Sequence, residues 1–164
     1  MGDLTGRVAI VTGGAMGIGR AIGIKMAELG ADIVVSDIDA DACQRTATEI
    51  AAMGVRSVGI PANVTDPEAV SRMVSETISR FGKIDVLVNN TGIHRRVDPL
   101  APQLEDVKEI FRVNLLGVLN MSSAVGRVMV EQGRGSIINI SALGGGLVGL
   151  GRGGSAYGMS KGGI

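Results

Sequence analysis

The sequence predicts an α/β fold in which a doubly wound parallel sheet carries helices on both faces. Short apolar runs of strand length alternate with longer amphipathic segments along the chain. The first run, residues 8–11, is apolar throughout, which is typical of a strand buried on both faces. Alternation of this kind favours parallel strands joined by right-handed helical crossovers. We therefore expect the sheet order 3-2-1-4-5 for the part present.

The boundaries of the expected elements follow from local signals. Apolar runs of strand length occur at residues 8–11, 33–35, 58–60, 84–88 and 136–140. A helix over 17–29 has its apolar residues at helical spacing, and Gly30 stops it. Asp39 is expected to cap the next helix, which ends before Gly54.

Three further helices complete the pattern. Thr65 and Glu68 have the spacing of a capping box for a helix that runs to Phe81 and ends at Gly82. One long helix is expected over residues 104–132. A glycine-rich loop at 144–154 then leads into a last helix that starts near Ser155.

Composition excludes several classes of protein. The 164 residues carry 16 Lys and Arg against 16 Asp and Glu, with a pI near 6.6, which argues against a nucleic-acid-binding protein. We expect one domain over residues 1–164, no membrane association and a cytoplasmic location, because no uninterrupted apolar run approaches ~18 residues and no signal peptide is recognisable. With one cysteine, Cys43, and one histidine, His94, we expect neither a disulfide nor a metal site. Cys43 is expected to be a small core residue.

A glycine-rich turn follows the first strand and opens the first helix. Residues 12–19 read Thr-Gly-Gly-Ala-Met-Gly-Ile-Gly. Glycines allow a tight turn and a close approach of the backbone to a pyrophosphate, whose charge favours a helix N-terminus. The position of the turn indicates a Rossmann-type dinucleotide site more strongly than a simple packing turn. The residues expected to hold the cofactor here are Gly13, Ala15, Met16, Gly17, Ile18 and Gly19.

An acidic residue ends the second strand. Asp37 lies 18 positions after Gly19, the region where a carboxylate accepts hydrogen bonds from the adenosine ribose. Its neighbours, Ser36 and Ile38, bring no positive charge that could hold a 2′-phosphate. Asp37 and Ile38 therefore favour NAD over NADP, although an aspartate at a strand end is also common as a turn cap.

A possible acid–base set lies near the end of the sequence. Tyr157 and Lys161 are four residues apart, so they share one face of a helix. A free phenol, with a pKa of ~10, is a poor base at neutral pH, and a nearby ammonium group favours its phenolate. Ser141 follows the fifth strand, at the sheet edge where open α/β folds bind ligands.

Together these motifs resemble the short-chain dehydrogenase/reductase family, from about residue 6 to the last residue. The chain carries in order the glycine turn, Asn89-Asn90-Thr91-Gly92, Asn114, Ser141 and Tyr157-x-x-x-Lys161. The resemblance implies that Tyr157 is the catalytic acid/base, that Lys161 assists it and binds the nicotinamide ribose, and that Ser141 binds the reacting oxygen. It implies that Asn114 holds a water of a proton relay. Asn90 and Gly92 would line the adenosine-ribose side of the cofactor, and Asn63 and Val64 would contact adenine.

The sequence departs from the family pattern in four places. Asn63 stands where an aspartate is usual, and Thr91 where alanine is commoner. The interval from Ser141 to Tyr157 is longer than usual, and residues 144–154 are expected to absorb the excess. Family members also extend beyond the point that corresponds to Ile164, with further strands and a substrate-binding segment. We expect the sequence to belong to a longer protein, a homodimer or homotetramer, and a polypeptide that ends at Ile164 to be inactive.

The resemblance implies an NAD-dependent oxidoreductase that exchanges a hydride with a secondary alcohol or ketone. Two alternatives stay open: an NADP-dependent carbonyl or 3-oxoacyl-thioester reductase, and a catalytically silent dinucleotide-binding or scaffold protein. The loop His94-Arg95-Arg96 is interpreted as a solvated loop, with a substrate-side wall as the alternative.

Overall fold

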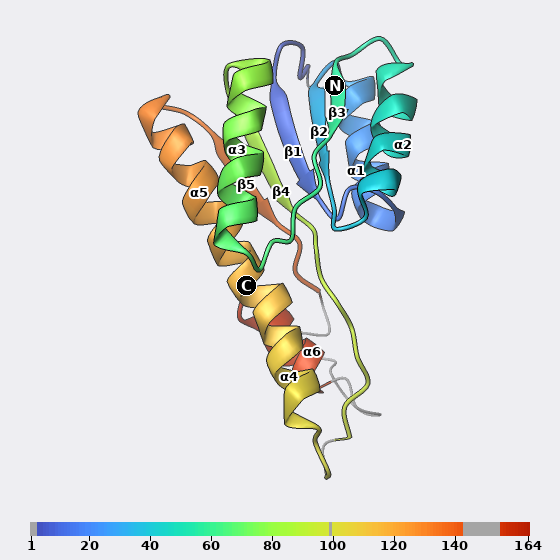
Figure 1. The fold of residues 1–164 in the computed structure, drawn as a ribbon, viewed down its shortest axis with the longest axis vertical. Coiled ribbons are helices and arrows are strands. Elements are labelled where there is room, and N and C mark those ends of the chain that lie inside the picture. Colours follow the sequence, from blue (N-terminus) through green and yellow to red (C-terminus); the bar gives the residue numbers. More distant parts are fainter. Residues whose placement is uncertain (1–2, 99, 143–154) are drawn as a thin grey trace.

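A five-stranded parallel sheet forms the centre of the molecule, as the computed structural model shows (Figure 1). The structure describes residues 3–98, 100–142 and 155–164. The strand order, β3-β2-β1-β4-β5, confirms the order expected from the sequence. The strands are β1 (Val8–Thr12), β2 (Asp32–Ser36), β3 (Ser57–Gly59), β4 (Val86–Asn89) and β5 (Ser136–Asn139).

Helices cover both faces of the sheet, which confirms the doubly wound architecture. Helices α1 (Gly17–Glu28) and α2 (Ala40–Ala51) lie on one face, and α3 (Pro67–Phe81) and α5 (Gly117–Glu131) lie on the other (Figure 1). The alternation of side chains along β1 explains the two layers: Ala9 and Val11 belong to the apolar cluster under α1 and α2, and Ile10 to the cluster under α3 and α5. Cys43 is fully buried in the first cluster, as expected, and burial raises the pKa of its thiol to about 11.

The sequence predicted capping residues for two helices, and the prediction is confirmed for α2 but not for α3. Asp39 caps α2, because its carboxylate accepts a hydrogen bond from the Ala42 N–H at 2.9 Å. The predicted capping box of α3 is wrong. Asp66 is the N-cap and accepts from the Glu68 N–H, while the Thr65 hydroxyl donates to the side-chain oxygen of Asn63 at 2.9 Å.

The long helix is interrupted, so the expectation of one continuous α-helix is wrong. Helix α4 (Leu104–Phe111) passes through a π-helical turn, η1 (Arg112–Leu116), before α5 begins. The Gly117 N–H bonds the Arg112 carbonyl, an i→i+5 bond that accommodates one extra residue. Helix α4 extends past the carboxyl ends of the strands and packs against α6 (Ser155–Gly162), as Figure 1 shows. The glycine-rich stretch at 144–154 lies outside the described residues.

The segment Leu104–Glu131 has a length and composition that could cross a membrane, with a mean hydropathy of 1.3 over its most apolar window. The segment is not an uninterrupted apolar run, because charged residues such as Arg112 and Arg127 occur within it. In the structure, Met121, Val125 and Met129 are used for packing in the cluster under α3 and α5. A helix that packs in a protein core can have the same length and composition.

A buried carboxylate fastens the amino end of the sheet. Asp85, just before β4, is 3% exposed at its side chain and accepts hydrogen bonds from the Val8 N–H and from Arg7, both at 3.0 Å. Lys83 and Arg134 lie 3.3 and 3.5 Å away. Burial alone would raise the pKa of Asp85, but these bonds and charges outweigh it and hold the pKa below the usual 3.8.

Replacement of this carboxylate has a predictable cost. We expect Asp85→Ala to lower the free energy of unfolding by about 3 kcal/mol, because the buried Val8 N–H loses its acceptor and three cations lose their partner. A depressed carboxyl pKa adds stability above pH 3.8 that is lost as the pH falls through the folded-state pKa, so the difference should narrow in acid. Urea unfolding at several pH values measures it. Glu105→Ala, which breaks an exposed pair with Lys108, is the control and should cost less than about 1 kcal/mol.

Candidate active site

A cavity of about 680 Å³ opens at the carboxyl ends of the strands, the edge where α/β sheets bind ligands. It is bounded by the segments that follow the five strands, by the π-turn region and by α6. Twelve of the residues selected from the sequence lie on its wall: Gly13, Met16, Ile18, Asp37, Ile38, Asn63, Val64, Asn90, Gly92, Ser141, Tyr157 and Lys161. The structure thus brings together residues from most of the chain in one concave site.

Gly13 and Gly19 leave no room for side chains in the glycine turn. Gly13 has φ +60°, and a Cβ atom added there would lie 2.9 Å from Asn90 Nδ2. A Cβ atom on Gly19 would fall on the Gly13 carbonyl oxygen and 2.5 Å from Asn90 Nδ2. Gly17 also has a positive φ, +55°, at the start of α1. Glycine is therefore required at these positions by backbone packing and conformation.

Asn90 braces this turn. Its side-chain amide donates to the carbonyls of Thr12, at 3.0 Å, and Gly13, at 3.2 Å. The Thr12 hydroxyl in turn accepts the N–H groups of Asn90 and Thr91 at 3.0 and 3.1 Å. The position of Asn90 on the cavity wall agrees with the expectation, but these bonds assign it the further task of holding the glycine turn against the end of β4.

The end of β2 carries the predicted acidic residue. Asp37 lines the cavity, and its carboxylate accepts the Ile38 N–H at 2.8 Å. Asn63 lies on the same wall, but its side-chain oxygen accepts the N–H and the hydroxyl of Thr65 at 3.0 and 2.9 Å. Its amide N–H groups are therefore what Asn63 offers to a ligand.

Lys161 is the buried cation of the site. Its side chain on α6 is 5% exposed, and Nζ donates to the Ile140 carbonyl at 2.7 Å, just after β5. Burial lowers the pKa of Lys161. Gly92 lies beside it, since a Cβ atom there would be 3.3 Å from Nζ. Gly92 therefore lies at the end of the cavity that holds Lys161. The resemblance implied instead that Gly92 lines the adenosine-ribose side of the cofactor.

Ser141 and Asn114 are both committed to protein partners. The Ser141 hydroxyl donates to the Lys161 carbonyl at 2.6 Å, so it has to turn before it can bind a substrate oxygen. Asn114, in the π turn, is fully buried and does not line the cavity. Its amide oxygen accepts the Ile93 N–H at 2.8 Å, and its amide nitrogen donates to the Ile93 carbonyl and to the Ser160 hydroxyl. Asn114 therefore joins the loop after β4 to α6.

Ala15, like Asn114, was selected from the sequence but does not line the cavity. It is buried in the cluster under α1 and α2, and its carbonyl accepts the Thr46 hydroxyl at 2.9 Å. Gly17 and Gly19 do not line the cavity either, and they contribute to the shape of the turn.

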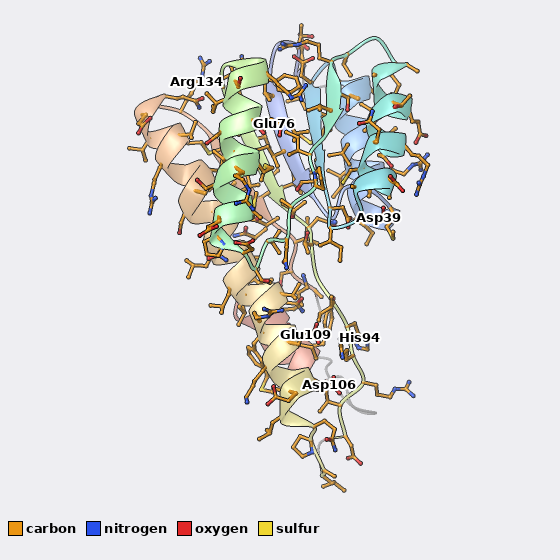
Figure 2. All side chains as sticks on the ribbon, in the orientation of Figure 1. Asp39, Glu76, His94, Asp106, Glu109 and Arg134 are labelled. Atoms are coloured by element: carbon orange, nitrogen blue, oxygen red, sulfur yellow. The ribbon has the colours of Figure 1, made fainter. Side chains whose placement is uncertain are left out.

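His94 forms part of the cavity wall, which was the alternative interpretation of its loop. The whole 94–96 stretch is exposed, as expected of a solvated loop, yet His94 also lines the cavity and contacts Tyr157, with ring centroids 4.8 Å apart and planes at 72°. Figure 2 shows His94 and Glu109 of α4 beyond the carboxyl ends of the strands. The one available signal was the position of His94, two residues after Gly92.

The sheet order, the glycine turn at α1 and a cavity at the carboxyl ends of the strands are features of dinucleotide-binding α/β proteins. A family model for the short chain dehydrogenases matches residues 7–164. The chain belongs to the short-chain dehydrogenase family.

Individual relatives agree with this assignment. The chain is 38% identical over 146 residues to a 3-oxoacyl-[acyl-carrier-protein] reductase of Synechocystis sp., covering 88% of this chain and 59% of the relative. It is 39% identical over 147 residues to a sorbitol dehydrogenase of Cereibacter sphaeroides, covering 87% and 55%. The chain thus spans little more than half the length of these curated relatives.

Solved structures are also similar. A short-chain type dehydrogenase/reductase from Mycobacterium marinum superposes with a TM-score of 0.94 at 35% identity, over 98% of this chain and 65% of that one. An NAD⁺-bound xylitol dehydrogenase gives a TM-score of 0.92 at 31% identity, over 97% and 61%. The family is that of oxidoreductases which use a nicotinamide dinucleotide and act on hydroxyl or keto groups of small molecules.

Proposed function

We propose that the protein is an NAD-dependent oxidoreductase that interconverts a secondary alcohol and a ketone. The observation that carries the proposal is the placement of Asp37, Tyr157 and Lys161 on one cavity behind the glycine turn. Residues 1–164 would form the NAD-binding domain. When bound, the dinucleotide supplies the hydride acceptor or donor, and the protein supplies binding, orientation and proton transfer.

The residues present fit such a cofactor. No side chain caps the start of α1, so its first backbone N–H groups are left for a pyrophosphate, and Gly13 and Gly19 allow the turn to pack closely against Asn90. Asp37 would accept the ribose hydroxyls, and the amide N–H groups of Asn63 would face the adenine. Met16, Ile18, Ile38 and Val64 supply apolar wall, and Lys161 would bind the second ribose.

The proton would move through Tyr157. During alcohol oxidation its phenolate accepts the hydroxyl proton, and during ketone reduction the phenol returns it. Lys161, one helical turn away, would stabilise the phenolate. Burial lowers the pKa of this lysine, because desolvation disfavours its charged form. Ser141, once turned from the Lys161 carbonyl, would donate to the developing alkoxide. If Asn114 holds the relay water with its side chain, it would do so through the remaining lone pair of its amide oxygen, because both amide hydrogens are bonded to protein.

An NADP-dependent carbonyl or 3-oxoacyl-thioester reductase is the second candidate. Two of the relatives are named as 3-oxoacyl-[acyl-carrier-protein] reductases. Asp37 opposes this candidate, because segment 36–40 contains two aspartates and no lysine or arginine. A silent scaffold protein is a weaker third, since Asn114, Ser141, Tyr157 and Lys161 are all retained.

The cofactor preference can be tested at Asp37. We expect the protein to bind NADH at least about tenfold more tightly than NADPH, because a carboxylate repels the 2′-phosphate. Asp37→Ala should remove most of this difference. Fluorescence titration with both nucleotides measures the two dissociation constants.

Asp39→Asn is the matched control, because it also removes a negative charge two residues away but preserves a capping side chain for α2. It should leave the NADH preference of the parent unchanged. Tighter binding of NADPH by the parent would support the second candidate, and failure to bind either nucleotide would refute the oxidoreductase proposal.

A further inference from the structure

The loop after β4 holds His94 in place from both sides. Ile93 is fixed by Asn114, which bonds both its N–H at 2.8 Å and its carbonyl at 3.0 Å. Arg95 forms ion pairs with Asp106 at 2.7 Å and Glu109 at 2.6 Å on α4. The position of His94 is therefore set by its neighbours on either side.

A third anchor follows two residues later. Val97 is buried in a small apolar cluster with Ile110 of α4 and Ala156 of α6. Because α6 also carries Tyr157, this cluster ties the loop to the helix that presents the phenol. The contact between the rings of His94 and Tyr157 is thus built into the packing.

His94 brings a hydrogen-bonding imidazole to the end of the cavity that carries Tyr157. An imidazole has one nitrogen that donates and one that accepts, which matches a hydroxyl group. The charged groups on this part of the wall are Glu109, already paired with Arg95, and Arg112 and Lys161. A substrate oxygen that hydrogen-bonds to Tyr157 would lie in the cavity that His94 also lines, and the ring centroids of the two residues are 4.8 Å apart.

We infer that His94 is a substrate-contacting residue that selects for an oxygen-bearing carbon next to the reacting one, as in vicinal diols and α-hydroxyketones. The inference rests on the proposed oxidoreductase function and specifies its substrate class. His94 donates to, or accepts from, the second oxygen while Tyr157 exchanges a proton with the first. The hydroxyl that remains on the neighbouring carbon is unchanged by the reaction.

Two alcohols that differ by one hydroxyl test this inference in the complete natural protein. We expect kcat/KM with NAD to be about tenfold higher for butane-2,3-diol than for butan-2-ol, the value of one good hydrogen bond. His94→Phe keeps a ring against Tyr157 but has no ring nitrogens, so it should bring the ratio of the two kcat/KM values close to one. His94→Gln retains a donor and an acceptor and should restore part of the ratio. Lactate distinguishes a neighbouring carboxylate from a hydroxyl, and oxidation of lactate in preference to the diol would overturn the proposed substrate class.

Controls separate loss of contact from loss of structure. Arg96→Ala changes an exposed residue of the same loop and should leave the ratio as in the parent. The far-ultraviolet circular dichroism spectrum and the melting temperature of each variant should match those of the parent, which shows that the fold is retained.

The outcomes divide cleanly. A parent ratio near one, or a ratio that His94→Phe leaves unchanged or that Arg96→Ala lowers equally, overturns the assignment of His94 and leaves the oxidoreductase proposal standing. A parent that binds NAD but oxidises none of the test alcohols overturns both.

Discussion

Tyr157→Phe should reduce alcohol oxidation by about 10³-fold while NADH binding stays within about threefold of the parent. The substitution deletes only the hydroxyl group, so the ring contact with His94 and the packing of α6 are retained. Without the hydroxyl, the group proposed to take the proton from the substrate oxygen is lost. Stopped-flow measurement of NADH formation in the complete natural protein, beside a fluorescence titration of NADH, gives both quantities.

The result discriminates between a catalytic and a structural tyrosine. A variant that loses NADH binding along with turnover would indicate that Tyr157 maintains the cavity. Substantial residual turnover would show that another group transfers the proton, and the proposed mechanism would then be abandoned.

Gly19→Ala should weaken NADH binding by at least about 100-fold. The added methyl group would collide with the Gly13 carbonyl and with Asn90, so the turn and its brace cannot both keep their positions. A displaced turn no longer presents the first N–H groups of α1 to the pyrophosphate. Isothermal calorimetry or NADH fluorescence measures the change, and circular dichroism reports whether the fold survives.

Gly23→Ala is the matched substitution one turn further along α1. A Cβ atom there would be 3.3 Å from Ile50 Cδ1, the movable end of a side chain, so binding should remain within about threefold of the parent. Equal losses of NADH affinity in the two variants would show that any added methyl group in α1 disrupts binding. The close contact between Gly19 and the turn would then not be the cause of the weaker binding.

The fold and one wall of the site could be predicted from the sequence because their signals are local. The apolar run of β1 and the glycines after it, then the acid after β2, have fixed places along the chain, and a parallel sheet brings strand ends to one edge. The tyrosine–lysine pair is equally local, since four residues on a helix place two side chains on one face.

What the sequence could not predict depends on contacts between distant segments. The brace from Asn90 to the Thr12 carbonyl joins positions 78 residues apart. The contact of His94 with Tyr157 depends on anchors from α4, η1 and α6. Thr65 has the right spacing for a capping box, but its hydroxyl is bonded to Asn63 and Pro67 follows Asp66, the actual cap.

The π turn at Arg112–Leu116 lets one helical rod serve two separate apolar clusters. Ile110, before the turn, faces the cluster shared with α6, and Met121, after it, faces the sheet. Removing one residue from the turn would restore regular winding and rotate everything beyond it by about 100° relative to α4. The extra residue thus sets the rotation of α5 relative to α4. We expect deletion of one residue from the turn to remove dinucleotide-dependent activity while the sheet stays folded, more effectively than most point mutations do.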